Sequence, residues 1–261
     1  RGKSKKDAAR RGNDIEASIK ISFEEAVFGC EKELEITKYD VCTHCKGQGA
    51  EPGSSIITCR HCNGSGEIRS VRNTILGQIT TSQHCEVCRG EGRVPEKLCN
   101  ACKGSTRIRI KERVKTRIPA GVDNGSTIRI NGKGEGGLKG GASGDLYITL
   151  GVEASRQFVR SGMDIHNELE IPLVQAVLGG TVVVDTLYGK SEIKIPAGTQ
   201  DGKVFKLSEH GVVSVGGNKK GNHLMKIKVK IPEKLSKKEK DLYLALAEEA
   251  GVDVNKGGLF W

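Results

Sequence analysis

Four short repeats of cysteine and glycine hold the residues most suited to chemistry. Each repeat has two cysteines separated by two residues, and eight of the nine cysteines belong to these pairs: Cys42 and Cys45, Cys59 and Cys62, Cys85 and Cys88, Cys99 and Cys102. Two intervening residues let both thiolates reach one ion from a tight turn, and structural zinc takes four such ligands in tetrahedral geometry. The pattern therefore predicts two closed sites of four cysteines, with two zinc ions as cofactors.

Glycines follow each pair, and they support the same prediction. They permit positive φ, so that the chain can turn back and aim backbone N–H groups at the sulfurs. Residues 42–106 contain few large apolar side chains, so metal must supply much of the folding energy of this segment.

Other uses of the cysteines are less favoured. No signal peptide is visible, and repeated pairs in a reducing compartment indicate zinc rather than disulfides. A single pair would be compatible with a thioredoxin-like redox motif, but four in tandem are not. His44, His61 and His84 lie beside cysteines, yet four thiolates per ion already suffice. The ninth cysteine, Cys30, is expected to be a small buried residue.

The sequence shows no catalytic site. It has no nucleophile–base pair, no paired carboxylates and no phosphate loop, because the glycine-rich residues 132–137 follow a strand without opening a helix. A zinc site closed by four thiolates has no open position for a catalytic water. We therefore expect a binding or scaffolding protein and not an enzyme.

The formal charge of +10 is concentrated near the start of the chain, where residues 1–11 hold six bases and one acid. Such a run is typical of a solvated linker, and the lack of stacking aromatic residues disfavours a nucleic-acid partner. No apolar run approaches the length of a membrane span, and no targeting segment is seen. A cytoplasmic protein is expected.

Two copies of one β-rich unit follow each other in the chain. The pattern from Asp14 to Cys30 recurs from Asp164 to Gly180, and Ile-Pro-Ala-Gly occurs at both 118–121 and 195–198. We predict a disordered basic linker (1–13), a first β domain (14–41 and 107–156), a cysteine-rich domain (42–106), a second β domain (157–232), and a helix with a tail (233–261).

The second copy shows where the cysteine-rich segment is inserted. There, residues 184–195 read as a hairpin with its turn at Leu187-Tyr188-Gly189, and the first copy holds the cysteines in the same place. The ends of the insert must then lie on adjacent strands. This favours one zinc held by the first and fourth pairs and another held by the second and third. Pairing in sequential order stays open.

The end of the chain predicts one helix. Ser236 and Glu239 form a capping box, and Leu242 and Leu246 share a face that continues toward the apolar end Leu259-Phe260-Trp261. Core packing is the first interpretation of this face, and self-association is the second.

Taken together, these features resemble the DnaJ (J-domain) co-chaperone family in its zinc-containing class. The resemblance extends from Arg10-Arg11-Gly12 to the terminal helix. It is carried by the four cysteine repeats, the doubled Ile-Pro-Ala-Gly and residues 144–147, Gly-Asp-Leu-Tyr. It implies a mainly β fold with two tandem β-sandwich-like domains and an elongated two-zinc arm inserted in the first. It also implies zinc pairing of first with fourth and second with third, and a homodimer joined through the C-terminal region.

The resemblance also implies a function. Such proteins bind unfolded or non-native polypeptides, prevent their aggregation, and deliver them to a DnaK-type chaperone that works with the exchange factor GrpE. A client strand adds to the first domain while an apolar side chain enters a pocket. By position, the pocket residues are Ile15, Leu34, Ile36, Val114 and Ile148. The alternative is that these are ordinary core residues.

The sequence departs from the family pattern in two ways. The His-Pro-Asp signature of the catalytic helical hairpin is absent, and the Gly/Phe linker is reduced to the basic stub. We therefore expect a fragment, or a relative without a J domain, that binds clients without stimulating ATP hydrolysis by itself. The second departure is Thr106, which replaces the last repeat glycine and affects only the local turn. Two other classes stay open: a nucleic-acid-binding zinc protein, and a thiol–disulfide oxidoreductase.

Overall fold

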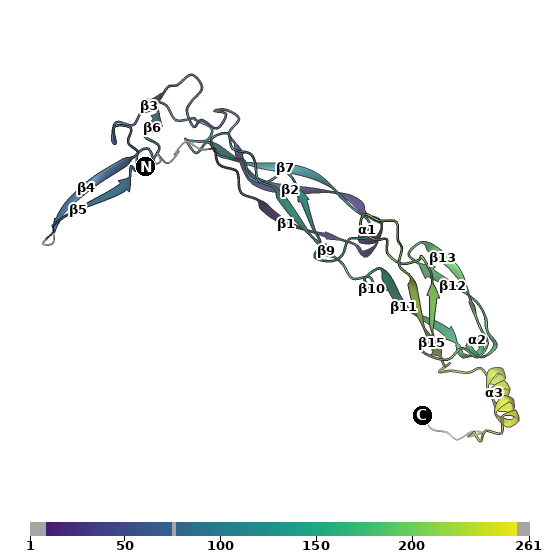
Figure 1. Cartoon of the computed structure of the whole chain (residues 1–261). Helices are drawn as coiled ribbons and strands as arrows, with labels where there is room; N and C mark the ends of the chain where they lie inside the picture. Colours follow the sequence, from purple (N-terminus) through teal and green to yellow (C-terminus); the bar gives the residue numbers. More distant parts are fainter. Residues whose placement is uncertain (1–8, 75–76, 255–261) are drawn as a thin grey trace. The chain divides into compact units, whose positions relative to one another are not determined.

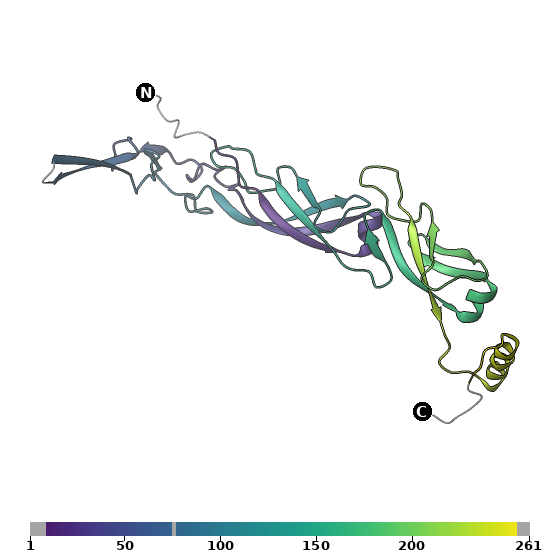
Figure 2. The ribbon, with the colours of Figure 1, turned by 60° about the horizontal axis from the view of Figure 1, so that its bottom comes forward.

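The computed structural model describes residues 9–74 and 77–254. Most of the regular structure is strand, with a helix near the C-terminal end, so the predicted mainly β fold is confirmed. The chain divides into two compact units, residues 1–153 and 154–261, which are described separately. Both are seen in Figures 1 and 2.

The first unit packs two small sheets against each other. In one, β1 (Ile15–Ile21) pairs in parallel with β9 (Leu146–Val152), which pairs antiparallel with β8 (Thr127–Ile130). In the other, β2 (Cys30–Val41) and β7 (Arg107–Ile118) form a long antiparallel ribbon. Apolar residues from both sheets, together with one from the following helix and one from the turn after β7, meet in one core: Ile21, Ala26, Ile36, Val114, Ile118, Val122, Leu146, Ile148 and Leu150.

A short helix, α1 (Phe23–Phe28), connects β1 to β2. The predicted capping box is confirmed, because the Ser22 hydroxyl accepts from the Glu25 N–H and the Glu25 carboxylate accepts from the Ser22 N–H. Gly29 ends the helix at φ 78°, where a Cβ would lie 2.8 Å from the Ile118 carbonyl oxygen. The helix can therefore pack against the Ile-Pro-Ala-Gly turn only with glycine at this position.

The ribbon carries one buried charge near the end that leads into the cysteines. The Lys38 side chain is 4% exposed and its Nζ lies 2.8 Å from Glu112 Oε2, while Lys133 Nζ lies 2.7 Å from the other Glu112 oxygen. Lys133 and Lys38 hold the pKa of Glu112 below its usual range. The carboxylate thus compensates the buried ammonium group.

Residues 10–13 pack onto the glycine-rich loop 132–144. Arg10 and Leu138 exchange two backbone hydrogen bonds, and the Gly12 N–H donates to the Ala142 carbonyl oxygen. A Cβ on Gly12 would lie 1.9 Å from the Glu135 carbonyl oxygen, so the two segments touch through their backbones. The predicted linker of residues 1–13 was therefore wrong for residues 10–13; residues 1–8 lie outside the described part of the chain.

The cysteine-rich segment leaves the ribbon at Val41 and returns at Arg107. It contains two short antiparallel pairs: β3 (Ile56–Thr58) with β6 (Arg93–Pro95), and the hairpin of β4 (Glu67–Thr74) with β5 (Gly77–His84). Figure 1 shows β2 and β7 running side by side into this segment.

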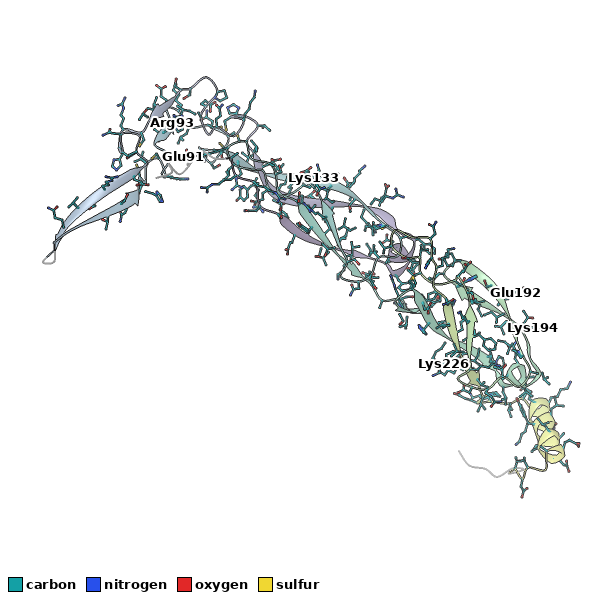
Figure 3. All side chains as sticks on the ribbon, viewed as in Figure 1. Glu91, Arg93, Lys133, Glu192, Lys194 and Lys226 are labelled. Carbon is teal, nitrogen blue, oxygen red and sulfur yellow. The ribbon has the colours of Figure 1, made fainter. Side chains whose placement is uncertain are left out.

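The second unit repeats the first with a shorter ribbon. A four-stranded sheet has the order β10 (Val159–Ser161), β11 (Asp164–Pro172), β15 (His223–Lys230), β14 (Val204–Leu207). After helix α2 (Leu173–Leu178), the predicted hairpin is confirmed as β12 (Gly180–Thr186) and β13 (Gly189–Ile195), with Glu192 and Lys194 exposed on β13 (Figure 3). Its core contains Ile171, Ala176, Val184, Ile193, Ile195, Met225 and Ile227.

Helix α3 (Lys237–Glu249) begins at the predicted capping box, in which Ser236 and Glu239 exchange hydrogen bonds. None of its residues is buried, and Leu242 and Leu246 are 66% and 62% exposed. Core packing of this face is thus not what the described residues show. The apolar end 259–261 lies outside them. Of the helices in the described part of the chain, none combines the length and apolar character needed to cross a membrane.

Candidate metal centres and polypeptide-binding surface

The proximal site, as we call the group nearest the ribbon, brings together the first and the fourth cysteine pairs. The ribbon stays paired up to Val41 and Arg107, and the Cys42 N–H donates to the Thr106 carbonyl oxygen (3.0 Å). All four thiols are buried and their sulfurs lie within 4.8 Å of one another: Cys42, Cys45, Cys99 and Cys102. The paired strands thus deliver both ends of the insert to one point.

The distal site brings together the second and the third pairs. The short β3–β6 pair and the β4–β5 hairpin hold them, with the Cys59 N–H donating to the Gly92 carbonyl oxygen and the Cys85 N–H to that of Gly66. Its four buried members are Cys59, Cys62, Cys85 and Cys88. Pairing in sequential order does not occur in the structure.

The spacing of the sulfurs matches a tetrahedral metal site. In the proximal site the Sγ atoms of Cys42 and Cys99 are 3.9 Å apart, and those of Cys45 and Cys102 are 3.7 Å apart. The corresponding distances in the distal site are also 3.9 and 3.7 Å. Four sulfurs about 2.3 Å from one zinc at tetrahedral angles would be about 3.8 Å apart, whereas a disulfide joins sulfurs at about 2.05 Å. Both groups could hold a metal ion.

The turns after the cysteines direct backbone N–H groups toward the sulfurs. Gly49 donates to Cys45 Sγ (3.3 Å), Gly66 to Cys62 Sγ and Gly92 to Cys88 Sγ (both 3.2 Å). These three glycines have φ between 73° and 76°, which suits glycine. Thr106 holds the fourth position at φ 66°, so the substitution keeps the turn but places a β-branched residue in a disfavoured conformation.

The protonation of the buried thiols is uneven. Burial disfavours the Cys45 thiolate, but the Gly49 N–H and the thiols of Cys42 and Cys102 bring its pKa down to about 7. Burial and the proximity of Cys99 and Cys45 raise the pKa of Cys102 to about 11. A bound metal would displace the protons of these thiols.

The three neighbouring histidines are exposed and stand outside both groups of four sulfurs. His44 Nε2 lies 2.9 Å from Glu51 Oε1, and the contact with His44 and the N–H of Asn100 hold the pKa of Glu51 below its usual range. Cys30 is half-buried rather than buried. Burial raises the pKa of its thiol, and the Glu25 carboxylate adds to this.

The five predicted pocket residues lie together around the core of the first unit. Ile36, Val114 and Ile148 are 5%, 4% and 0% exposed, whereas Ile15 and Leu34 are half-buried and pack against them. The first three are therefore core residues, and a ligand could reach only the last two without rearrangement.

Ile15 and Leu34 both lie on strands with an unpaired edge. Among the described residues, β1 pairs only with β9, and β2 pairs only with β7. In the second unit, the equivalent of β1 is β11, and β10 covers the start of its outer edge through the pairing of Val159 with His166. An unpaired edge can accept another strand.

A groove of about 860 Å³ in the second unit was not anticipated from the sequence. Its apolar lining comes from separate strands and the segment before them: Phe158, Val159, Leu169, Val183, Val184, Val204 and Leu224. Charged residues also line it, among them Lys226, labelled in Figure 3. Val183 and Val204 set this surface apart because they are 57% and 55% exposed. The alternation of apolar and polar residues along the strands does not reveal this exposure.

Comparison with known proteins agrees with the arrangement of repeated units and inserted cysteines. The family model described as DnaJ C terminal domain matches residues 15–232. The chain belongs to the DnaJ C-terminal domain family. It is 41% identical to "Chaperone protein DnaJ" of Acetivibrio thermocellus over 256 residues, which is 98% of this chain and 66% of that protein. The protein of the same name from Crocosphaera subtropica is 42% identical over 250 residues, 95% of this chain and 66% of the relative.

A third relative named "Chaperone protein DnaJ", from Methanothermobacter thermautotrophicus, is 40% identical over 255 residues, covering 98% of this chain and 68% of that protein. The chain thus spans about two thirds of the length of these DnaJ proteins. The family and these names support a chaperone role.

Proposed function

We propose that the chain is the client-binding part of a DnaJ-type chaperone and that it carries two structural zinc ions. The tetrahedral spacing of eight buried sulfurs supports the zinc proposal. In this role each zinc would hold two distant chain segments together, and because four thiolates close each site it would leave no position for a substrate. The cysteines would act as ligands and not as redox groups, and the chain would catalyse no reaction.

We propose that client polypeptides bind to the first unit as an added strand. The observation that carries this proposal is that the half-buried Ile15 and Leu34 lie on strands whose outer edges are unpaired in the described part of the chain. Main-chain hydrogen bonds along an edge would accept many sequences, and an apolar contact at Leu34 would favour non-native segments. The combination gives broad specificity for unfolded chains.

Replacing Leu34 with aspartate tests this surface. We expect Leu34→Asp to abolish the suppression of aggregation of a denatured model protein, because a carboxylate there opposes entry of an apolar side chain. Thr37→Asp is the matched control: it adds the same charge to the exposed face of the same strand and should leave suppression unchanged. Zinc content and far-UV circular dichroism report folding.

Should Leu34→Asp unfold, Leu34→Ala takes its place, and suppression of aggregation is expected to fall severalfold. Full suppression by a folded Leu34 variant contradicts the proposal.

We further propose that the complete protein passes clients to a DnaK-type chaperone acting with GrpE, in the cytoplasm, and that it is a homodimer joined through the C-terminal region. The exposed Leu242 and Leu246 on α3 support the dimer, because an apolar face without a partner favours association. In sedimentation velocity, the double variant Leu242→Glu/Leu246→Glu should be monomeric where the unmodified chain is dimeric. A dimer that persists in the variant contradicts this contact.

A further inference from the structure

The four cysteine pairs share a position that differs in only one of them. Nine residues after its first cysteine, each of the second, third and fourth pairs has an apolar residue: Ile68, Val94 and Ile108. The first pair has Glu51 at this position. Ile68 and Val94 pack against the distal cysteines, and Ile108 packs against the proximal ones. A carboxylate thus occupies, in the proximal site alone, a position otherwise used to cover sulfurs with apolar atoms.

Both oxygens of Glu51 are engaged, and they join the two halves of the proximal site. Oε1 lies 2.9 Å from Nε2 of His44, a residue that stands between the two cysteines of the first pair in the sequence. Oε2 accepts a hydrogen bond from the Asn100 N–H (2.8 Å), which directly follows Cys99 in the fourth pair. The side chain is 26% exposed, so solvent competes only in part for these contacts.

The backbone around Glu51 reinforces this connection. The Glu51 N–H donates to the Lys97 carbonyl oxygen, and the Cys99 N–H donates to the Gly49 carbonyl oxygen, both at 3.0 Å. A carboxylate oxygen of Glu51, a ring nitrogen of His44 and the Cys99 sulfur all lie within 4.8 Å of one another. The carboxylate is therefore next to a predicted ligand but outside the group of four sulfurs.

We propose that Glu51 is a positioning residue for the proximal metal centre, which it stabilises by fixing the Asn100 peptide and with it the direction of Cys99. The inference rests on the proposed binding of two zinc ions. Hydrogen-bonded groups outside the ligand set typically change metal affinity by about 10- to 100-fold. The distal site has Ile68 and Val94 at the equivalent positions, and neither can accept such a hydrogen bond. The proximal site should thus depend on this contact, and the distal site should not.

Residue-resolved alkylation tests the proposal. The zinc-loaded chain is exposed to a chelator and pulsed with a maleimide, and each cysteine is then quantified by peptide mass spectrometry. In Glu51→Val, which introduces the residue type of the other positions, we expect alkylation of the proximal cysteines to accelerate at least about 10-fold. The rates at the four distal cysteines should stay unchanged. Glu51→Gln keeps an oxygen that can accept from Asn100 and should remain within severalfold of the unmodified chain.

Glu86→Ala is the matched control, because it removes an exposed acid directly after the distal Cys85 and separates a general charge effect from the specific contact. Unchanged proximal rates in a folded Glu51→Val chain, or equal acceleration at both sites, would overturn the proposal. If Glu51→Val fails to fold, the comparison of Glu51→Gln with Glu51→Ala decides, with only the alanine variant expected to lose zinc faster. Failure of zinc binding itself is distinguishable, because all eight cysteines of the unmodified chain would then react rapidly.

Discussion

The ribbons of the two β units begin and end alike but close in different ways. In both, the first strand follows a helix that ends at glycine and the second runs into Ile-Pro-Ala-Gly, and a Cβ on Gly29 or Gly179 would meet the turn at the same 2.8 Å. In the second unit, seven-residue strands are joined by Leu187 and Tyr188. In the first, twelve-residue strands lead to the cysteines. One scaffold thus accepts either a turn or a separately stabilised segment.

The longer ribbon contains a buried lysine whose charge is compensated by a carboxylate. Its extension carries Lys38 on the inward face, and Glu112 with Lys133 completes the charge pairing. The units also differ at one core position. Leu146 in β9 and His223 in β15 occupy the same place in the repeat, and both are 0% exposed. The first unit has an apolar core there, whereas the second buries a titratable group.

The largest expected effect is loss of the metal from the proximal site, at the end of the longer ribbon. Cys99→Ser should bind one zinc ion fewer per chain and expose residues 42–50 and 96–106 to proteolysis, because structural zinc contributes roughly 10–16 kcal/mol to the folding of small modules. The hairpin β12–β13 should be unaffected. Metal analysis and limited proteolysis measure both. Cys30→Ser, at a half-buried cysteine outside the metal groups, is the control; loss of the second unit as well would contradict the comparison.

An intermediate effect is expected at His223. Its Nε2 contacts Asn167 Oδ1 (3.0 Å), its Nδ1 has no hydrogen-bond partner among the described residues, and burial, helped by His210 and His166, lowers its pKa to about 4. The unfolded state then binds a proton first as pH falls. The contribution of neutral His223 to the free energy of unfolding is therefore full above about pH 6.5. It decreases toward pH 4, by roughly 3 kcal/mol in total.

His223→Leu, which introduces the residue of the first unit, should remove this pH dependence. The measurement is the difference in unfolding free energy between the two chains from pH 7 to pH 4, from urea titrations. This difference cancels the contribution of other titrating groups. His223→Leu/Asn167→Ala reproduces the first unit at both positions, since Asn167 corresponds to Ala17, and guards against an unpaired amide. A constant difference across this pH range would show that His223 does not destabilise the second unit in acid.

The smallest effect is expected at Thr106. A non-glycine residue at φ 66° is disfavoured, so Thr106→Gly should stabilise the proximal site by about 1 kcal/mol. Chelator titration against the unmodified chain measures this as a shift in zinc retention. Gly49→Ala, the reverse change at the equivalent position, should weaken retention. Weaker zinc binding in Thr106→Gly would mean that Thr106 makes a contact outweighing its backbone strain.

Local patterns in the sequence allowed much of this comparison to be predicted. The capping boxes at Ser22 and Ser236, the hairpin at Leu187 and the tandem β units follow from short-range spacing, and comparing the copies favoured the cysteine grouping that the structure shows. Contacts between distant segments could not be predicted in this way. The packing of Gly12 onto residues 132–144, the pairing of Lys38 with Glu112 and the Glu51 contacts depend on how the elements meet in space.

The most direct test is to measure amide hydrogen exchange of the chain with and without a bound, permanently unfolded model protein. We predict protection along the free edge of β1 or β2, including residues near Ile15 and Leu34, and its loss in Leu34→Asp but not in Thr37→Asp. Protection confined to the cysteine-rich residues 42–106, or to the groove of the second unit, would contradict the claim that the first unit binds the client as an added strand.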